Sequence, residues 1–140
     1  MLDLMKLLKK IFGYKPEEKI LILYDTPTIK DNKEWKNRRK LAYEWQENLK
    51  KQRVKTEIAF YSATYANNAD FPVKWCLGGK EENIDESISG FDIIIALTEF
   101  SCTAPLHKYA KKSGIRAVSM PGFTRKMLPA LELDYSDVAK

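Results

Sequence analysis

The stretch FDIIIALTEFSCTAP, residues 91–105, decides the fold class. Its first half is an unbroken run of apolar, mostly β-branched residues, which is typical of a strand buried on both faces of a parallel sheet. Its second half turns polar and then reaches Pro105, a residue suited to the first turn of a helix. A buried strand that leads through a polar loop into a helix is the repeating unit of an α/β domain.

Other segments repeat this alternation. The run KILILYD, residues 19–25, predicts a second buried strand, and a long helix follows through residue 51 with Asp31 or Asn32 as its N-cap. The segment 54–61 alternates polar and apolar side chains, which indicates a strand with one exposed face. Residues 115–120 predict a fourth strand, and Thr124 caps a further predicted helix. A short helix is expected over residues 83–88, stopped by Gly90.

The alternation predicts a three-layer α/β domain of Rossmann-like or flavodoxin-like type, because each parallel crossover needs its own covering segment. We expect a mostly parallel sheet of about four to five strands in the order 2-1-3-4, with the two most apolar runs in the middle. Residues 64–79 have no clean periodicity and are expected to form an irregular, functional or mobile segment. The 140 residues fit one domain.

Composition and charge pattern bear on whether the protein binds nucleic acid. The net charge of +5 suggests a nucleic-acid partner. However, Trp35 and Trp45 share one apolar stripe of the long helix, and its charged residues fit a solvated face on which Glu34 and Arg38 are spaced as a helix-supporting pair. We therefore expect no nucleic-acid partner and predict that both tryptophans cover the sheet.

The N-terminal segment MLDLMKLLKKIFGY is interrupted by lysines. It therefore predicts a short amphipathic helix docked on the domain, or on a partner, rather than a targeting signal or a membrane segment. Cys76 and Cys102 lack the spacing of a disulfide framework or of a zinc site. We expect a cytoplasmic protein with reduced thiols.

Polar residues gather where the predicted strands end. In an open parallel sheet, ligands bind outside the carboxyl ends of the strands, where the connections diverge to opposite faces. The candidate residues for such a crevice are Asp25, Thr26, Thr98, Glu99, Ser101, Thr103, Ser119 and Gly122. Ser101 or Thr103 has a structural alternative, because either hydroxyl would cap the following helix. We expect Asp25 and Glu99 to face the same crevice, since a carboxylate at a strand end needs water or donors.

Other motifs point to no catalytic residue. The chain has no dinucleotide-binding or Walker-type glycine pattern, and LGGK at residues 77–80 is too short for a phosphate loop. The segment MPGFT, residues 120–124, precedes a predicted helix and could present amides to an anion. His107 is expected at the surface. Cys102 lies beside a helix start but has no evident base.

The succession of segments resembles the N-terminal domain of the aminopeptidase T-like metallopeptidases, a group typified by thermophilic leucyl aminopeptidases. The resemblance lies in KPEEKILILYD at 15–25, in the unit FDIIIALTEFSCTAPLHKYAKKSGIR at 91–116, and in SMPG at 119–122 leading to ML. It covers nearly the whole chain in order. The chain differs from that family at residues 102–105, where the family tends to show His next to a Thr.

The resemblance implies a two-domain cytosolic exopeptidase-like protein, often dimeric, whose C-terminal domain holds two divalent metals of the zinc or cobalt type. On this interpretation, residues 1–140 are a single N-terminal domain without catalytic or metal-binding residues. Its partners are the C-terminal domain and, in a dimer, a second copy. Whether the whole protein is a peptidase or an enzyme of other chemistry stays open. The alternative is a free-standing module that binds a nucleotide or another small anion in the same crevice.

Overall fold

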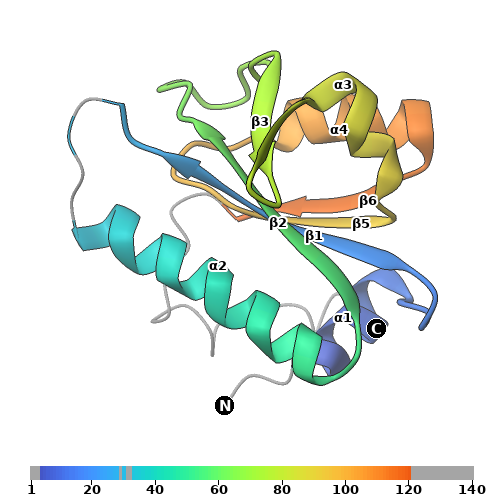
Figure 1. Ribbon diagram of the computed structural model, residues 1–140. Helices are drawn as coiled ribbons and strands as arrows, with labels where there is room; N and C mark the ends of the chain where they lie inside the picture. The colour runs from blue at the N-terminus through green and yellow to red at the C-terminus, as the bar shows by residue number, and fades with distance from the viewer. Residues whose placement is uncertain (1–3, 29, 31–32, 121–140) are drawn as a thin grey trace.

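The computed structural model describes residues 4–28, 30 and 33–120 (Figure 1). Helices and strands alternate along most of this part of the chain. The elements are α1 (Leu4–Phe12), β1 (Lys19–Thr26), α2 (Lys33–Lys51), β2 (Lys55–Ser62), β3 (Lys74–Leu77), β4 (Lys80–Asn83), α3 (Ile84–Ser87), the 3-10 helix η1 (Ile88–Gly90), β5 (Ile93–Leu97), α4 (Thr103–Ser113) and β6 (Arg116–Ser119). The helix predicted after Thr124 lies outside the described residues.

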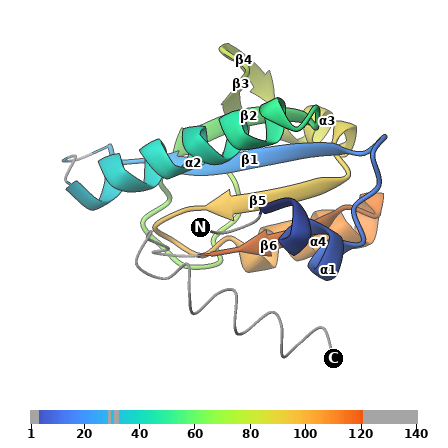
Figure 2. The ribbon, with the colours of Figure 1, turned by 90° about the horizontal axis from the view of Figure 1, so that it is seen from below.

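Within the described residues, six strands form one sheet in the order β4-β3-β2-β1-β5-β6 (Figure 2). The strands β2, β1, β5 and β6 are neighbours and run parallel. The strands β3 and β4 form an antiparallel hairpin that extends the sheet beside β2. The α/β class is confirmed, but the predicted strand number and the predicted order for the whole sheet were wrong.

The missed hairpin has a local cause in the sequence. Leu77 and Lys80 are paired, and the two residues between them form the turn. Gly78 and Gly79 both have positive φ, 58° and 86°, as in the two-residue turns that match the twist of antiparallel strands. The Gly-Gly pair that we considered only as a phosphate loop is therefore a hairpin turn. Part of the segment predicted to be irregular belongs to the sheet, residues 74–77, and residues 78–79 form its hairpin turn.

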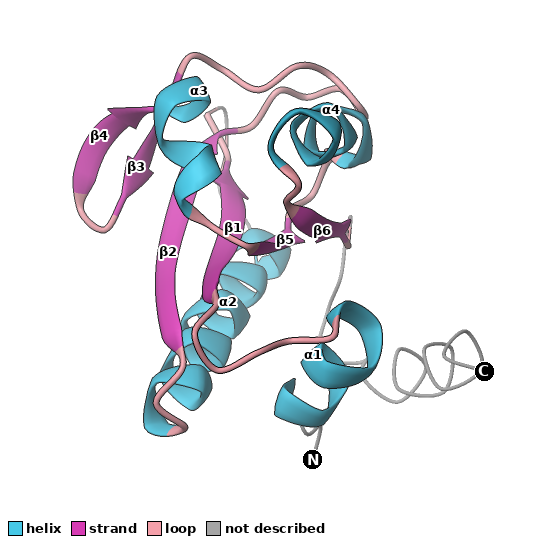
Figure 3. Cartoon of the chain, turned by 90° about the vertical axis from the view of Figure 1, so that its right-hand side faces the viewer, coloured by secondary structure: helices cyan, strands magenta, loops and turns pink. Residues whose placement is uncertain are grey.

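Helices cover both faces of the sheet (Figures 1 and 3). On one face, α1 and α2 pack over Ile20 and Ile22 of β1. On the other face, α3, η1 and α4 pack over Leu21 and Leu23 of the same strand. Because β1 has helices on both sides, its six central residues are all buried, which explains its continuous apolar run.

The long helix α2 buries both of its tryptophans, as predicted. Trp35 is 7% exposed and Trp45 is 6% exposed. The N-terminal helix α1 docks on the same side of the sheet, with Leu4 and Leu8 buried in the core it shares with α2. In the described ranges, no helix has both the length and the apolar character needed to cross a bilayer.

Candidate functional site

The polar residues predicted at the strand ends meet at one edge of the sheet, on the left in Figure 1. We call this the carboxyl edge, and it comprises the exit of β1 at residues 25–28, the segment 61–68 after β2, the loop 98–104 between β5 and α4, and Ser119 at the end of β6. It lies where the helices that follow β1 and β5, α2 and α4, pack on opposite faces of the sheet.

Asp25 is the buried anchor of the carboxyl edge. Its side chain is only 4% exposed. One carboxylate oxygen accepts a hydrogen bond from the amide of Glu99 at 2.9 Å, and the other accepts from the amide of Phe100 at 3.4 Å. Burial raises the pKa of Asp25 above its ordinary value, against the opposing effect of these two amides and of Arg38. Asp25 thus ties the end of β1 to the loop that follows β5.

Arg38 of α2 is a buried cation beside these carboxylates. It is 3% exposed, forms an ion pair with Glu99, and lies over the ring of Trp35 at 5.1 Å. Within the described residues, its Nη2 atom makes this ion pair without the geometry of a hydrogen bond. The structure therefore places Asp25 and Glu99 side by side, with the Glu99 amide bound by Asp25 and the Glu99 carboxylate paired with Arg38.

Arg38 was misassigned by sequence reasoning, which placed it on the solvated face of the helix with Glu34. The helical spacing carried a signal that could have found it. Arg38 lies three residues after Trp35 and three before Leu41, so all three share the buried face of α2. A charged residue in the middle of an apolar stripe indicates a buried partner of opposite sign.

Six consecutive amides of the loop between β5 and α4 each donate to a side-chain oxygen. Besides the two bound by Asp25, Ser101 donates to Asn67 Oδ1 at 2.9 Å, Cys102 to Ser119 Oγ at 3.0 Å, Thr103 to Ser101 Oγ at 3.4 Å, and Ala104 to Asn68 Oδ1 at 3.0 Å. Amides outside a sheet ladder need other acceptors where they are buried, and here the bonds of Glu99, Phe100 and Cys102 are partly buried. The polar residues at this edge therefore have a shared structural task.

The start of α4 is satisfied by the chain itself. Its first two amides, of Thr103 and Ala104, have the side-chain acceptors just described. Pro105 has no amide hydrogen, and the amide of Leu106 donates to the carbonyl of Cys102 at 3.0 Å. Because these donors are already used, the N-terminus of α4 does not offer a ready cradle for an anion. Neither Ser101 nor Thr103 is the N-cap residue, which is Cys102 without a side-chain capping bond; Ser101 accepts only the Thr103 amide, and Asn68 accepts that of Ala104.

Three polar side chains in or beside the loop 98–104 are buried: Thr98, Tyr61 and Cys102. Thr98 is completely buried and donates to the carbonyl of Phe100 at 2.7 Å. The Cys102 thiol donates to Ser119 Oγ at 3.5 Å. Burial raises the pKa values of both Cys102 and Tyr61. A buried and protonated thiol is a poor nucleophile, so this group fits a structural role.

The remaining candidates are more peripheral. Thr26 ends β1 and donates from its hydroxyl to the carbonyl of Tyr61 at 3.4 Å. Thr103 is exposed, and its hydroxyl lies 3.1 Å from that of Ser101. His107 is exposed on α4, as predicted, and lines a hollow of about 120 Å³ between α4 and β6. Gly122 lies outside the described residues.

The described residues do not fit a metal centre. Among them, no group of three or more His, Cys, Asp or Glu side chains is placed to hold a metal ion. Asp25 and Glu99 are the two carboxylates at the carboxyl edge, and Arg38 already supplies the positive charge next to Glu99.

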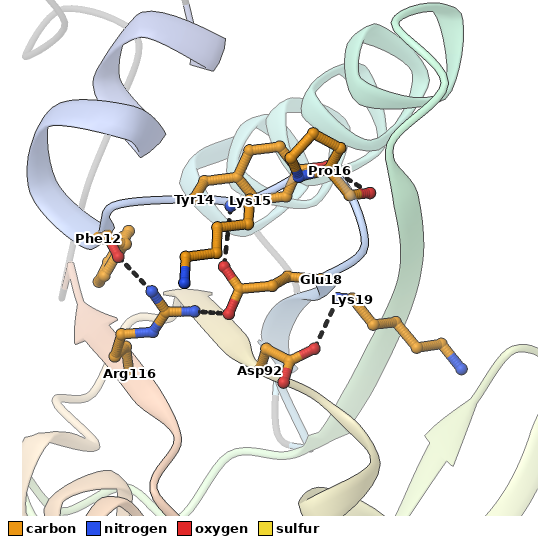
Figure 4. Close-up of polar contacts among 8 residues, drawn as sticks. All are labelled: Phe12, Tyr14, Lys15, Pro16, Glu18, Lys19, Asp92 and Arg116. Atoms are coloured by element: carbon orange, nitrogen blue, oxygen red, sulfur yellow. Dashed lines mark hydrogen bonds and ion pairs between the residues drawn. The ribbon is translucent and has the colours of Figure 1, made fainter.

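The opposite end of the sheet carries a second polar network (Figure 4). Arg116 at the start of β6 donates to the carbonyl of Phe12 and to the carboxylate of Glu18. Glu18 also accepts from the amide of Lys15 at 2.9 Å, and Asp92 accepts from the amide of Lys19 at 2.8 Å. This amino edge holds the end of α1 and the following turn against β6, and sequence reasoning did not single it out.

In comparisons with known proteins, no family model, no curated protein and no solved structure matched the chain.

Proposed function

We propose that this chain is the non-catalytic, crevice-forming domain of a metallo-aminopeptidase-like protein. Its carboxyl edge forms one wall of a substrate crevice, and a second domain carries the divalent metals of the zinc or cobalt type. The succession of segments at residues 15–25, 91–116 and 119–122 is the basis of this family assignment. A Rossmann-like or flavodoxin-like arrangement of the parallel strands, a cytoplasmic location and a homodimer belong to the same proposal.

One observation carries the proposal: side chains of the domain accept all six amides of residues 99–104. In the present structure these bonds give the carboxyl edge a defined shape. Catalysis at this edge would need an activated nucleophile or a general base, but Cys102 is buried with a raised pKa and Asp25 is committed to two amides. A preformed wall that positions a substrate fits these facts better than a reacting centre does.

The same observation counts against the alternative of a free-standing anion-binding or nucleotide-binding module. Such a module uses free amides at a helix N-terminus to hold phosphate oxygens. Here Asn68 occupies the amide of Ala104, and the amide of Thr103 is used by Ser101. A nucleotide would have to displace these side chains before it could bind.

The first test is a hydrolysis assay of the 140-residue chain on leucyl and arginyl amide substrates with zinc or cobalt added. We expect no metal-dependent turnover. Glu99→Gln is the matched variant, because Glu99 is the more exposed carboxylate of the pair and the change preserves its size. Metal-dependent turnover by the wild-type chain that this variant loses would place an active site in the domain and contradict the proposal.

The second test asks for binding rather than catalysis. A short peptide such as Leu-Gly-Gly, added at millimolar concentration to the isotopically labelled chain, should shift NMR signals at the exits of β1, β2 and β5. Weak binding is expected because one wall supplies only part of a crevice. Signal changes confined to the amino edge, or none at all, would contradict the proposal, and stronger shifts with inorganic phosphate would favour the anion-binding module.

A further inference from the structure

The segment 64–73 between β2 and β3 crosses the carboxyl edge, and we call it the strap. It touches the exit of β1, where the hydroxyl of Tyr65 accepts from the amide of Thr28 at 2.8 Å. It also touches the loop between β5 and α4 through two consecutive asparagines. The strap therefore connects the ends of three neighbouring strands.

The asparagine contacts form a compact clamp. Asn67 Oδ1 accepts from the amide of Ser101, and Asn68 Oδ1 accepts from the amide of Ala104 and, at 3.3 Å, from the hydroxyl of Ser101. The amide of Asn68 donates to the carbonyl of Ser101 at 2.7 Å. Both asparagines are exposed to solvent. Water competes for exposed hydrogen bonds, so this clamp belongs to the part of the fold that opens most easily.

The strap backbone is held in an uncommon conformation. Tyr65 has φ of 57° and Asn68 has φ of 61°, both in the left-handed region. Asparagine enters this region more readily than most residues, whereas an aromatic side chain seldom does. Such a conformation persists when surrounding contacts hold it, and here those contacts are the bonds to Thr28, Ser101 and Ala104.

A series of ring contacts connects the strap to the buried Arg38. The ring of Tyr65 lies 5.3 Å from that of Phe100, and the ring of Phe100 lies 6.4 Å from that of Trp35. The guanidinium group of Arg38 lies over the ring of Trp35. Tyr65 is 40% exposed, whereas the Arg38 side chain is 2% exposed. The strap therefore supplies the most exposed ring of this series of contacts, which runs from Tyr65 through Phe100 to Trp35 beside Arg38.

We propose that the strap is a gate over the carboxyl edge, closed in the present structure, which opens as one unit. Release of Asn68 from α4 frees Asn67 and withdraws Tyr65 from both Thr28 and Phe100, which uncovers the ring of Phe100 beside Glu99. Access to the wall then depends on the strap. This inference rests on the proposed function only in that it takes the carboxyl edge to face a ligand.

The experiment is amide hydrogen exchange of single-residue variants, followed by NMR. Asn68→Gly removes the acceptor and suits the positive φ, so the backbone conformation itself is not penalised. We expect the amides of Ser101, Ala104 and Thr28 to exchange roughly 2- to 10-fold faster, the range that corresponds to the loss of one exposed hydrogen bond. The amide of Thr28 is decisive, because the Asn68 side chain does not bond to it.

Two further variants and one internal reference complete the design. Asn68→Asp keeps the acceptor and adds a charge that favours a helix N-terminus, so exchange should return to the wild-type rate or fall below it. Val73→Ala, at the 71% exposed end of the strap, should change nothing. The amide of Leu23 in the middle of β1 reports global unfolding and should stay constant.

Faster exchange at Ala104 with no change at Thr28 would show that the two anchors open independently and would overturn the gate. Faster exchange at Leu23 in the same proportion would assign the effect to global stability and would also overturn it. The measurement needs no substrate. It can therefore fail while the hydrolysis and peptide tests succeed, and a failure of those tests leaves the exchange result unchanged.

Discussion

The two ends of the sheet stabilise loops with the same kinds of group in opposite environments. At the carboxyl edge, Asp25 and Arg38 are 4% and 3% exposed, and side-chain oxygens hold the backbone. At the amino edge, the side chains of Arg116 and Glu18 are 36% and 16% exposed. Removing a partner from a buried polar network leaves groups that water cannot reach, whereas an exposed ion pair is replaced by hydration. Burial therefore predicts which edge is the more sensitive to substitution.

The largest effect is expected from Asp25→Ala. This change leaves the amides of Glu99 and Phe100 without acceptors and removes a carboxylate near the buried Arg38. We expect the free energy of unfolding to fall by about 3 kcal/mol, as for other losses of a buried charged partner. Urea unfolding followed by circular dichroism measures it. The control Asp25→Asn keeps one oxygen acceptor and should lose clearly less; a loss below about 1 kcal/mol for the alanine variant would contradict a buried anchor.

A smaller loss is expected from Glu99→Gln. Glu99 is the exposed member of the ion pair, with 32% of its side chain accessible, so water replaces part of what the carboxylate contributes. Arg38 retains Asp25 nearby. We expect a loss of about 1 to 2 kcal/mol in the same unfolding measurement. A loss as large as that of Asp25→Ala would mean that the buried carboxylate of Asp25 contributes no more to stability at the carboxyl edge than the exposed carboxylate of Glu99 does.

The pH dependence of the free energy of unfolding tests the burial of Asp25 at the carboxyl edge. The pKa of Asp25 is raised above its ordinary value of 3.8, so the folded protein holds this proton more tightly than the unfolded chain does. In the pH window just above 3.8, the contribution of Asp25 to stability therefore decreases as pH rises. The free energy of unfolding of the wild type minus that of Asp25→Asn should fall between pH 3.5 and pH 6, measured at about half-unit steps. A difference that grows with pH would show that the amides outweigh desolvation.

The smallest effect is expected at the amino edge, from Arg116→Gln. Arg116 connects β6 to the carbonyl of Phe12 and to Glu18, both near the end of α1. Because this ion pair is partly exposed, we expect a loss of at most about 1 kcal/mol. The amides of α1 should exchange faster while those of β1 do not. A loss equal to that of Asp25→Ala would remove the contrast between the two edges.

Local sequence patterns predicted the features that depend on neighbours within one helix or strand. The buried strands and the two buried tryptophans follow from apolar periodicity, which depends on neighbours along one element. The Gly78-Gly79 hairpin also had a local signal, but the pair was assessed only as a phosphate loop. The burial of Arg38 could have been predicted from its three-residue spacing to Trp35, but the interpretation assumed that charged residues of the helix face solvent.

The role of the asparagines could not be read locally. Asn67 and Asn68 lie more than 30 residues from the amides that they bind, and nothing in their own segment specifies that distance. The loop 99–104 likewise shows polar side chains in sequence, whereas its acceptors come mainly from β1, the strap and β6. Long-range backbone satisfaction is a property of the assembled fold, so the function of these residues became visible only in three dimensions.

The central claim is that, while the strap is closed, side chains of the domain hold the loop between β5 and α4 as a wall of defined shape. Amide hydrogen exchange of residues 99–104 in the wild-type chain tests it most directly. The account predicts that all six amides exchange more slowly than in an unstructured chain, most of all Glu99, which is bound to the buried Asp25, and least of all Ser101 and Ala104, whose acceptors lie on the strap. Exchange of these amides at the rate of an unstructured chain, in a protein whose β1 amides remain protected, would contradict it.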